Sequence, residues 1–585
     1  MVRNFPRSTY RLARLTRLSV VAGVCLGVLT ACGTTQVQVV STSRPTTAEH
    51  FMAATANPFA TEAALEMLRE GGSAADAAIA AQMVLTLVEP QSSGIGGGAF
   101  MMYFDADTGD IGAYDGRETA PASATPEMFL DADGAPRDWY DTVVGGLSVG
   151  VPGVLRMLEM VHAEHGRLPW KRLFEPAILL ARDGFPVSER LNYLSAGDDD
   201  LLVFEGTAEY FFDGDGNPHP AGSILTNPVL ARTLDLIANY GADMFYRGQI
   251  ADDIARTTHT ADQNPGGMVA ADLGAYEAKK RAPVCLPYRT YLVCGMPPPS
   301  SGGITTLQIL GILQEFDMAR IAPGSATSVH LVAEASKLAF ADRNVYLADP
   351  DFYPPPPGML DTDYLKLRAS EISLTRAMDT AQPGMPGIGA SNRLAPDNVD
   401  KGLSTTHLSI IDGEGNAVSM TSSIESQFGS HLMVRGFLLN NQLTDFSFEA
   451  ERDGAPLANS PEAGKRPRSS MSPTLVFDDT GRVVLAIGSP GGSSIIGYVT
   501  QSLIATLDWN LNVQQAIDLP HFLNKNGKTS LEEGTALEKL KPALEQMGHE
   551  VGVRKMVSGL QGIALGKNGY EGGADPRREG VAGGE

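Results

Sequence analysis

The sequence has few cysteines and little positive charge. Cysteine occupies only 4 of its 585 positions, and 45 Lys and Arg stand against 68 Asp and Glu, which gives a net charge of −23. Nucleic-acid binding needs a clustered basic surface, so this balance argues against a nucleic-acid partner. Neither an H-E-x-x-H motif nor a pair of C-x-x-C motifs occurs. We therefore expect neither a metal site built by the protein nor a cofactor.

The N-terminal region also lacks an apolar run long enough to span a bilayer comfortably. Its apolar run, residues 18–31, is shorter than the roughly 20 residues that a spanning helix needs. It follows five arginines and ends in Leu29-Thr30-Ala31-Cys32-Gly33, which resembles a bacterial lipoprotein box. This pattern predicts a signal peptide over 1–31, a lipid on Cys32, a tether over 32–52 and a location in the cell envelope, with membrane contact through the lipid anchor alone. Ordinary secretion with an incidental cysteine is the alternative.

Two cysteines remain in the body of the chain. Cys285 and Cys294 flank an eight-residue segment in which a two-residue turn at Arg289-Thr290 would place them directly opposite each other. The narrow separation across an antiparallel pair fits a disulfide, and an exported protein can keep one. Two reduced thiols on a sheet are the alternative.

The segment with the strongest chemical signal is a hairpin after residue 403. Residues 404–412 alternate so that Thr405, His407 and Ser409 share one strand face, and 413–415 form a turn before a second strand-like run. This register places Thr405 opposite Ser423, with Glu425 one pleat further on the same face. A threonine hydroxyl beside a second hydroxyl suits a nucleophile with polar support. The alternative is an ordinary half-buried hairpin rich in Thr and Ser.

Other segments alternate between helix and strand signals. Helices are expected over 58–68, 73–87 and 154–162, with an amphipathic helix over 330–346, and strands over 99–104, 111–114 and 483–487. Residues 381–402, rich in Pro, Gly, Asn and Asp, are expected to form an exposed linker that delivers the chain to Thr405. Gly491 and Gly492 precede a helix start near Ile495, where bare N–H groups could stabilise a developing negative charge.

A competing nucleophile is Ser148. Gly146-Leu147-Ser148-Val149-Gly150 matches the G-x-S-x-G elbow of α/β hydrolases. However, Pro152 and Gly153 stand where the helix of the elbow should begin, and the preceding apolar stretch is short for a central strand. The motif on its own is weakly specific, so Thr405 is favoured.

Several motifs taken together resemble the γ-glutamyltranspeptidases (glutathione hydrolases), a family of the N-terminal-nucleophile superfamily. The resemblance extends from about residue 53 to 578. The motifs that carry it are Asn57-Pro58, Glu89-Pro90-Gln91-Ser92-Ser93-Gly94, Asp115-Gly116-Arg117-Glu118, Pro297 to Gly303, Ala339-Phe340-Ala341-Asp342-Arg343, Thr405-Thr406-His407, Asn440-Asn441-Gln442, Ser469 to Pro473 and Pro490 to Ser493. It implies an α+β fold, a four-layer αββα sandwich. It also implies self-cleavage before Thr405 into a large subunit, 53–404, and a small subunit, 405–585, which stay together as a heterodimer.

The resemblance also implies a role for each site residue. Thr405 would be the nucleophile, with its freed α-amine as base and Ser423 as support, while Gly491 and Gly492 would form the oxyanion site. Glutathione or another γ-glutamyl donor would be held at both ends of its amino-acid head, and water or an amino acid or peptide would accept the acyl group. The carboxylate end would contact Arg117, Ser469 and Ser470, and the ammonium end would contact Glu425, Gln442 and Asp445.

The sequence departs from the family pattern at three places. Ser423 replaces a threonine, Glu425 replaces an asparagine, and the loop over 446–468 lacks a tyrosine that could serve as a lid. We expect a more acidic ammonium end and a more open pocket. Two other functions remain open: an acylase of the glutaryl/cephalosporin or polyglutamate type on the same fold, and a lipoprotein that binds γ-glutamyl peptides without turnover.

Overall fold

The computed structural model describes residues 39–387, 394–397 and 404–585. The predicted signal peptide and Cys32 lie outside these residues. No helix in the described part of the chain is both long enough and apolar enough to cross a membrane.

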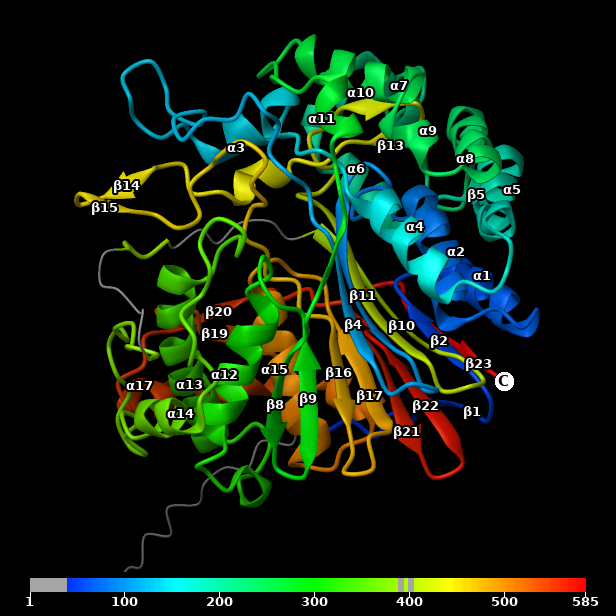
Figure 1. Cartoon of the computed structure of the whole chain (residues 1–585). Helices are drawn as coiled ribbons and strands as arrows, with labels where there is room; N and C mark the ends of the chain where they lie inside the picture. Colours follow the sequence, from blue (N-terminus) through cyan, green and yellow to red (C-terminus); the bar gives the residue numbers. More distant parts are fainter. Residues whose placement is uncertain (1–38, 388–393, 398–403) are drawn as a thin grey trace, which may run out of the picture. The chain divides into compact units, whose positions relative to one another are not determined.

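Two antiparallel sheets of seven strands pack face to face (Figure 1). The first sheet has the order β1 (Thr46–Ala48), β22 (Gly569–Ala574), β21 (Gln561–Gly566), β17 (Val483–Gly488), β16 (Thr474–Phe477), β9 (Tyr291–Gly295) and β8 (Val284–Tyr288). The second has the order β23 (Val581–Gly584), β2 (Met52–Thr55), β10 (Ser404–Ile411), β11 (Ala417–Glu425), β3 (Gly98–Phe104), β4 (Ile111–Gly116) and β7 (Lys279–Arg281).

Helices cover the outer face of each sheet. The second sheet is covered by α1 (Pro58–Arg69), α2 (Ala74–Val88) and α4 (Val154–His165), with α5 (Glu175–Asp183) and α8 (Pro228–Tyr240) packed beyond them. The first sheet is covered by α12 (Gly302–Leu313), α15 (Ser494–Leu507) and α16 (Val513–Asp518), and α13 (Ala326–Tyr346) and α14 (Thr362–Ala369) pack against α12. This arrangement confirms the predicted αββα sandwich.

Helix α2 shows why the sequence forms this layer. Ser73 caps its N-terminus in a reciprocal capping box with Asp76, and every residue of the helix is buried. Its many alanines let it lie close to α1, α4, α5 and the second sheet at once.

Helix α13 differs from its prediction. We expect an amphipathic helix from the sequence, but all residues from Ser328 to Tyr346 are buried. Polar side chains on this helix find partners inside the protein instead of facing water: Gln308 and Tyr364 donate to Asp342, and Lys337 lies against Glu334. The amphipathic prediction is wrong because these internal partners replace solvent.

The central hairpin of β10 and β11 has the predicted register from Ile411–Ala417 to Thr406–Ser422. At its end the register shifts, so that Ser404 pairs with Glu425 and two residues of β11 oppose Thr405. Glu425 takes a positive φ of 79° at this bulge. The predicted pairing therefore holds as far as Thr406 and Ser422, and the bulge lies beyond it; Glu425 still lines the same pocket as Thr405 and Ser423.

The hairpin of β8 and β9 turns where the sequence predicts. Tyr288 pairs with Tyr291 and Cys285 with Cys294, and the two cysteines form a disulfide in the structure.

The linker before Thr405 is not exposed throughout. Within 381–402, Ala395 and Asp397 are buried. The Asp397 carboxylate lies 3.0 Å from the Arg468 guanidinium, and both side chains are almost fully buried. The prediction of an entirely exposed linker is therefore wrong, because an internal ion pair anchors its second half at Asp397.

Candidate active site

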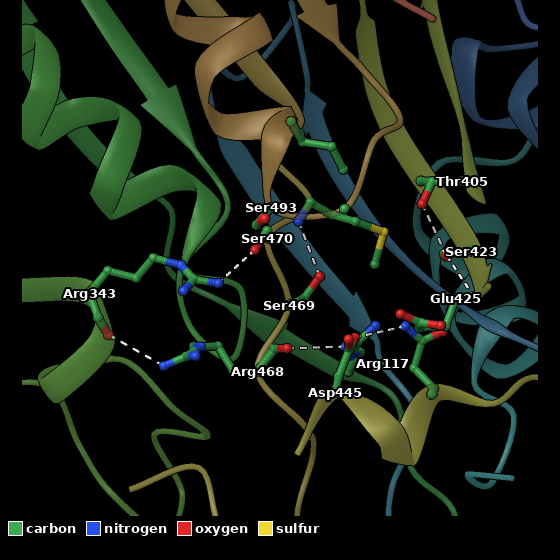
Figure 2. A pocket seen from close by; sticks show the side chains of 14 residues that line it. Arg117, Arg343, Thr405, Ser423, Glu425, Asp445, Arg468, Ser469, Ser470 and Ser493 are labelled. Carbon is green, nitrogen blue, oxygen red and sulfur yellow. Dashed lines mark hydrogen bonds and ion pairs between the residues drawn. The ribbon is translucent and has the colours of Figure 1, made fainter. Parts of the chain in front are cut away.

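One pocket collects nearly all of the predicted site residues (Figure 2). It lies where β10 begins, β11 ends and the loop after β17 leads into α15. Its lining comprises Arg117, Arg343, Thr405, Ser423, Glu425, Gln442, Asp445, Arg468, Ser469, Ser470, Met471, Gly492, Ser493 and Ile495. Of the ten predicted catalytic and substrate-binding residues, only Gly491 does not line it, and Gly491 directly precedes Gly492.

The Thr405 hydroxyl is held against the peptide bond that precedes it. Its Oγ1 donates to the carbonyl oxygen of Ser404 at 2.6 Å and lies 3.1 Å from Oγ of Ser423. The Ser423 hydroxyl donates to the same carbonyl at 2.9 Å. Arg578 Nη1 donates to the Thr405 carbonyl at 2.9 Å, which fixes the other side of the residue. The predicted nucleophile and the carbonyl that it would attack therefore belong to one hydrogen-bonded group.

No titratable side chain contacts the Thr405 hydroxyl in the part of the chain that the structure describes. His407, two residues further along β10, is bonded instead to Thr421 and Ser409, and burial lowers its pKa to about 3. It packs so closely on Gly488 that a Cβ at that glycine would lie 2.3 Å from the ring. This histidine fills the space between the sheets and is not positioned to act as a base. A base for Thr405 must come from elsewhere.

Arg117 supplies the positive end of the pocket from the loop after β4. Its side chain is 1% exposed. Nε donates to the Pro467 carbonyl at 3.1 Å, and Nη2 contacts Asp445 and the Arg468 carbonyl. Among the described residues, the charged partner of Nη1 is Glu118, at 3.7 Å, and no hydrogen bond from Nη1 is found. This nitrogen therefore keeps donors for a ligand carboxylate.

Unpaired acceptors gather at the other end. Glu425 Oε1 and Gln442 Oε1 are buried and have no hydrogen-bond partner among the described residues. Asp445 Oδ2 accepts from Arg117 and Gln442, and no donor to Oδ1 is found in the described chain. Three acceptor oxygens with free lone pairs match the three N–H donors of an ammonium group.

Asn440 and Asn441 hold these acceptors in place. Asn440 exchanges hydrogen bonds with Gly150, donates to the Gly96 carbonyl and accepts from the Gln442 N–H. Asn441 Nδ2 donates to Glu425 at 2.7 Å. The short 3-10 turn over Gln442–Asp445 is thus tied to two separate loops, which fixes the direction of its side chains.

Sequence reasoning missed Arg343 and Arg468 as site residues. Arg343, at the end of α13, donates to Ser470 Oγ at 2.8 Å and to Ser301 Oγ at 2.9 Å (Figure 2). Arg468 is held by the buried Asp397. Arg343 ends one motif that carries the family resemblance, and Arg468 directly precedes another. A buried arginine at a helix end is the signal that could have identified Arg343. The hydroxyl of Ser469 accepts from the Met471 N–H at 3.1 Å.

The glycine loop between β17 and α15 has the geometry expected of an oxyanion site. Gly491 and Gly492 have φ values of 131° and 56°, which side-chain-bearing residues rarely adopt. Their carbonyls accept from Ser494 and Ile495 in the first turn of α15. Neither of their N–H groups donates to a described residue, so both remain for a ligand oxygen.

Ser148 has a structural role. It lies in a 3-10 turn, is fully buried, and its hydroxyl donates to the carbonyls of Val143 at 2.6 Å and Gly145 at 3.0 Å. A hydroxyl directed at backbone carbonyls and without a base cannot serve as a nucleophile.

The buried carboxyl of Glu425 should make the thermal stability of the protein depend on pH. Burial, reinforced by the charge of Asp445, raises its pKa well above the ordinary value. A carboxyl whose pKa rises on folding favours the fold while it is protonated, and this contribution is lost as the pH rises toward the folded pKa. We expect Glu425→Gln to melt with the parent near pH 4 and about 2 °C above it near pH 8. Calorimetry between pH 4 and pH 8 measures the melting temperatures, with the exposed Glu451→Gln variant as control. The same melting temperature for parent and Glu425→Gln at every pH would contradict the prediction.

Comparisons with known proteins extend over nearly the whole chain. A family model described as gamma-glutamyltranspeptidase matches residues 60–585. The glutathione hydrolase proenzyme of Escherichia coli (strain K12) is 38% identical over 549 residues, which cover 91% of either sequence. The acylase ACY 1 proenzyme of Pseudomonas sp. (strain SE83) is 34% identical and aligns with 90% of this chain and 92% of its own length. The solved structure of cephalosporin acylase from Bacillus halodurans has a TM-score of 0.80 at 28% identity and covers 93% of this chain and 97% of its own.

Proposed function

The chain belongs to the gamma-glutamyltranspeptidase family, and we propose that it cleaves the γ-glutamyl amide of glutathione and related compounds through an ester on Thr405. Water or the amine of an amino acid or peptide then accepts the γ-glutamyl group. The reaction uses no cofactor.

One observation carries this proposal: the pocket offers matching partners for both charges of an amino-acid head beside the Thr405 hydroxyl. Arg117 Nη1 retains donors, while Glu425, Gln442 and Asp445 retain acceptors. A donor held at its α-carboxylate and α-ammonium presents its γ-carbonyl to Thr405. Charge-assisted hydrogen bonds are about twice as strong as neutral ones, so this end of the substrate can fix the reacting carbonyl.

Maturation follows from the contacts of Thr405. Its Oγ1 attacks the Ser404 carbonyl carbon, the C–N bond to Thr405 breaks, and an ester replaces the amide while the nitrogen gains a proton. Ser423, which donates to the carbonyl oxygen, stabilises the charge that develops there. Water then hydrolyses the ester and leaves a carboxylate on Ser404 and a free α-amine on Thr405. The products are the large and small subunits.

The freed amine supplies the base that the side chains do not. Its reference pKa of about 7.7–8.0 lies near neutral pH, so it can take the proton of the Thr405 hydroxyl. The hydroxyl oxygen attacks the γ-carbonyl, and the N–H groups of Gly491 and Gly492 bind the oxyanion. The amine returns the proton to the leaving amide nitrogen. Water or an acceptor amine then releases the γ-glutamyl group by the reverse of these proton transfers.

Turnover of γ-glutamyl anilide by the purified protein tests the function. We expect free glutamate without an acceptor and a new γ-glutamyl peptide, seen by mass spectrometry, when glycylglycine is added. A two-chain protein that turns over neither γ-glutamyl anilide nor glutathione would contradict the proposal. An uncut chain that binds γ-glutamyl peptides without turnover would identify a binding lipoprotein instead.

An acylase that acts on glutaryl or polyglutamate groups is the second candidate. It is favoured by the similarity to the Pseudomonas acylase and to the cephalosporin acylase structure. A glutaryl group carries the carboxylate but lacks the α-ammonium. The three acceptors around Glu425 would then have no cation to bind, so the pocket favours an amino-acid head group.

We also propose that the chain is exported and anchored through a lipid on Cys32, supported by the arginine-rich start, the short apolar run and Leu29-Thr30-Ala31-Cys32-Gly33. Intact-mass analysis should show a mature chain that begins at Cys32 and carries acyl mass. Cys32→Ser should move the protein from the membrane fraction to the soluble fraction. Equal membrane association of variant and parent would contradict the anchor.

A further inference from the structure

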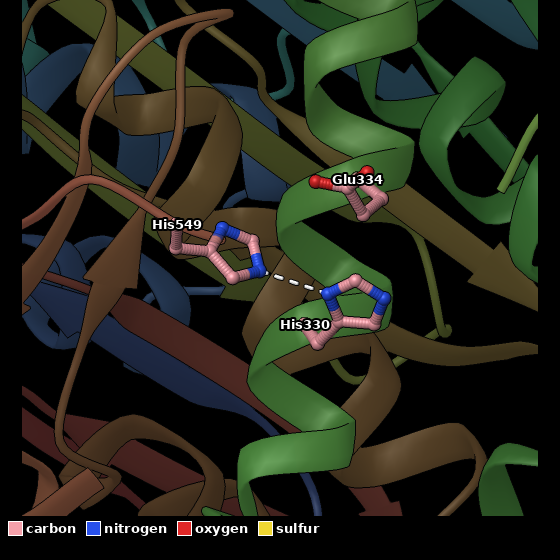
Figure 3. Close-up of side chains that lie close together, drawn as sticks. All are labelled: His330, Glu334 and His549. Atoms are coloured by element: carbon pink, nitrogen blue, oxygen red, sulfur yellow. Dashed lines mark hydrogen bonds between the residues drawn. The ribbon is translucent and has the colours of Figure 1, made fainter. Parts of the chain in front are cut away.

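Three buried side chains that the proposed reaction does not use meet between α13 and the segment after α17 (Figure 3). His330 and Glu334 lie one turn apart on this helix, and His549 follows α17 (Lys541–Gln546). One ligand atom from each lies within 4.8 Å of the other two. His330 and Glu334 are 0% exposed and His549 is 4% exposed. Sequence motifs do not reveal this set, because its third member is distant in the chain.

In each histidine, the ring nitrogen that points away from the other histidine already has a hydrogen-bond partner. His330 Nε2 lies 2.7 Å from the Ser373 carbonyl, which can only accept, so this nitrogen carries the proton and Nδ1 has a free lone pair. His549 Nδ1 lies 3.0 Å from the Thr529 hydroxyl, which can donate or accept and therefore serves either tautomer of the ring. Metal-binding histidines are oriented in this way, by a hydrogen bond from the nitrogen that does not bind the metal.

The inner nitrogens point at each other. His330 Nδ1 and His549 Nε2 are 2.8 Å apart (Figure 3). With neutral rings, one proton from His549 can bridge them. If that proton moves to Nδ1 of His549, where the Thr529 hydroxyl accepts it, the lone pairs of His330 Nδ1 and His549 Nε2 both face the space between the two rings. Two imidazole nitrogens on a tetrahedral zinc ion are about 3.3 Å apart, so a small opening accommodates the ion.

Glu334 contributes a carboxylate oxygen without a hydrogen bond. Its Oε2 accepts from the Met378 N–H at 2.7 Å. Lys337 Nζ lies 2.9 Å from Oε1, at an angle that forms no hydrogen bond, and donates to the Met378 carbonyl. Oε1 is thus a buried anionic acceptor beside two imidazoles. Lys337 balances the charge of the carboxylate, and the hydrogen bond from the Met378 N–H to Oε2 holds the carboxylate in place.

We propose that His330 Nδ1, His549 Nε2 and Glu334 Oε1 bind a divalent transition-metal ion of the zinc class. Two imidazoles and one carboxylate are ligands that zinc accepts, with a fourth position for water. The site lies apart from Thr405 and has no part in the γ-glutamyl reaction. His330 and Glu334 precede Thr405 in the chain and His549 follows it, so the ion joins segments that cleavage would assign to different subunits.

Zinc itself is the probe. The full-length mature protein is prepared from zinc-supplemented culture, incubated with excess Zn²⁺, desalted and analysed for metal per chain. We expect one tightly bound zinc, and X-ray absorption at the zinc edge should show two imidazole nitrogens and light oxygen ligands. This measurement uses the parent protein, so it does not depend on how any variant folds. No retained zinc after both treatments overturns the proposal.

Variants locate the ion. Glu334→Gln and His549→Gln should each weaken zinc binding by at least about 100-fold. The matched control is His431→Gln, in the other described group of three possible ligands, with Asp198 and Asp200; it should retain the parent affinity. Zinc retained equally by parent and His549→Gln, or lost in His431→Gln, would overturn the assignment. Zinc loss should leave γ-glutamyl turnover at low temperature unchanged, which separates this result from any failure of the proposed function.

Discussion

Replacement of Thr405 by alanine is expected to give one uncut chain that turns over γ-glutamyl anilide at least about 10³-fold more slowly than the parent. The hydroxyl is required twice, first to attack the Ser404 carbonyl and then to attack the substrate. Within the described parts of the chain, its hydrogen-bond partners are that carbonyl and Ser423. No neighbouring side chain in the described chain is placed to replace it.

A denaturing gel and an initial-rate assay measure both effects. The parent should show two chains, one ending at Ser404 and the other comprising 405–585. Thr405→Ser keeps a hydroxyl and should still be cut, while Thr406→Ala removes the adjacent hydroxyl, which contacts Ser93, and should be cut as the parent is. A fully active Thr405→Ala protein would rule out this nucleophile.

Asp445→Asn is expected to lower kcat/KM for γ-glutamyl anilide by about 30- to 1,000-fold and to change glutaryl-anilide turnover by less than about fivefold. The carboxylate is the charged acceptor for the substrate ammonium, and loss of one member of a buried charge pair costs roughly 2–4 kcal/mol. Glutaryl anilide has no ammonium group, so it makes no such contact with Asp445 and should be little affected by the substitution. The side chain is 18% exposed and stays polar in the variant, so the fold should persist.

Parallel kinetics with the two anilides separate the proposed function from the acylase alternative. Glu449→Gln alters a carboxylate at the surface of the same loop region, paired with Arg452, and serves as control. An equal loss on both substrates would show that Asp445 acts by holding Arg117 and not by binding the ammonium. Higher activity of the parent on glutaryl anilide than on γ-glutamyl anilide would favour the acylase.

Local patterns were sufficient for much of the fold and for the centre of the site. Strand alternation and a three-residue turn fix the register that brings Thr405 to Ser423, because each ladder pair determines the next. The positions of Arg117 and Asp445 could be predicted only from the resemblance, since nothing local brings these distant residues together. The structure adds their direct contact.

Other features depend on distant partners and could not be read from local sequence. The bulge that redirects Glu425 is set where β11 leaves the ladder, beside Asn441. Burial of the polar face of α13 depends on Gln308 and Tyr364, which come from two other helices. The anchoring of Asp397 likewise requires Arg468, 71 residues later.

The order of strands in the second sheet has a consequence for how the two subunits of the proposed cleavage could be produced. β23 and the pair β10–β11 follow the proposed cleavage site, whereas β2, β3, β4 and β7 precede it. β2 lies between β23 and β10, so its ladder bonds on both sides join it to strands from beyond that site. Neither piece can complete this sheet alone. Separately expressed halves should therefore be insoluble, and a working enzyme should require the uncut precursor or co-expression of both pieces.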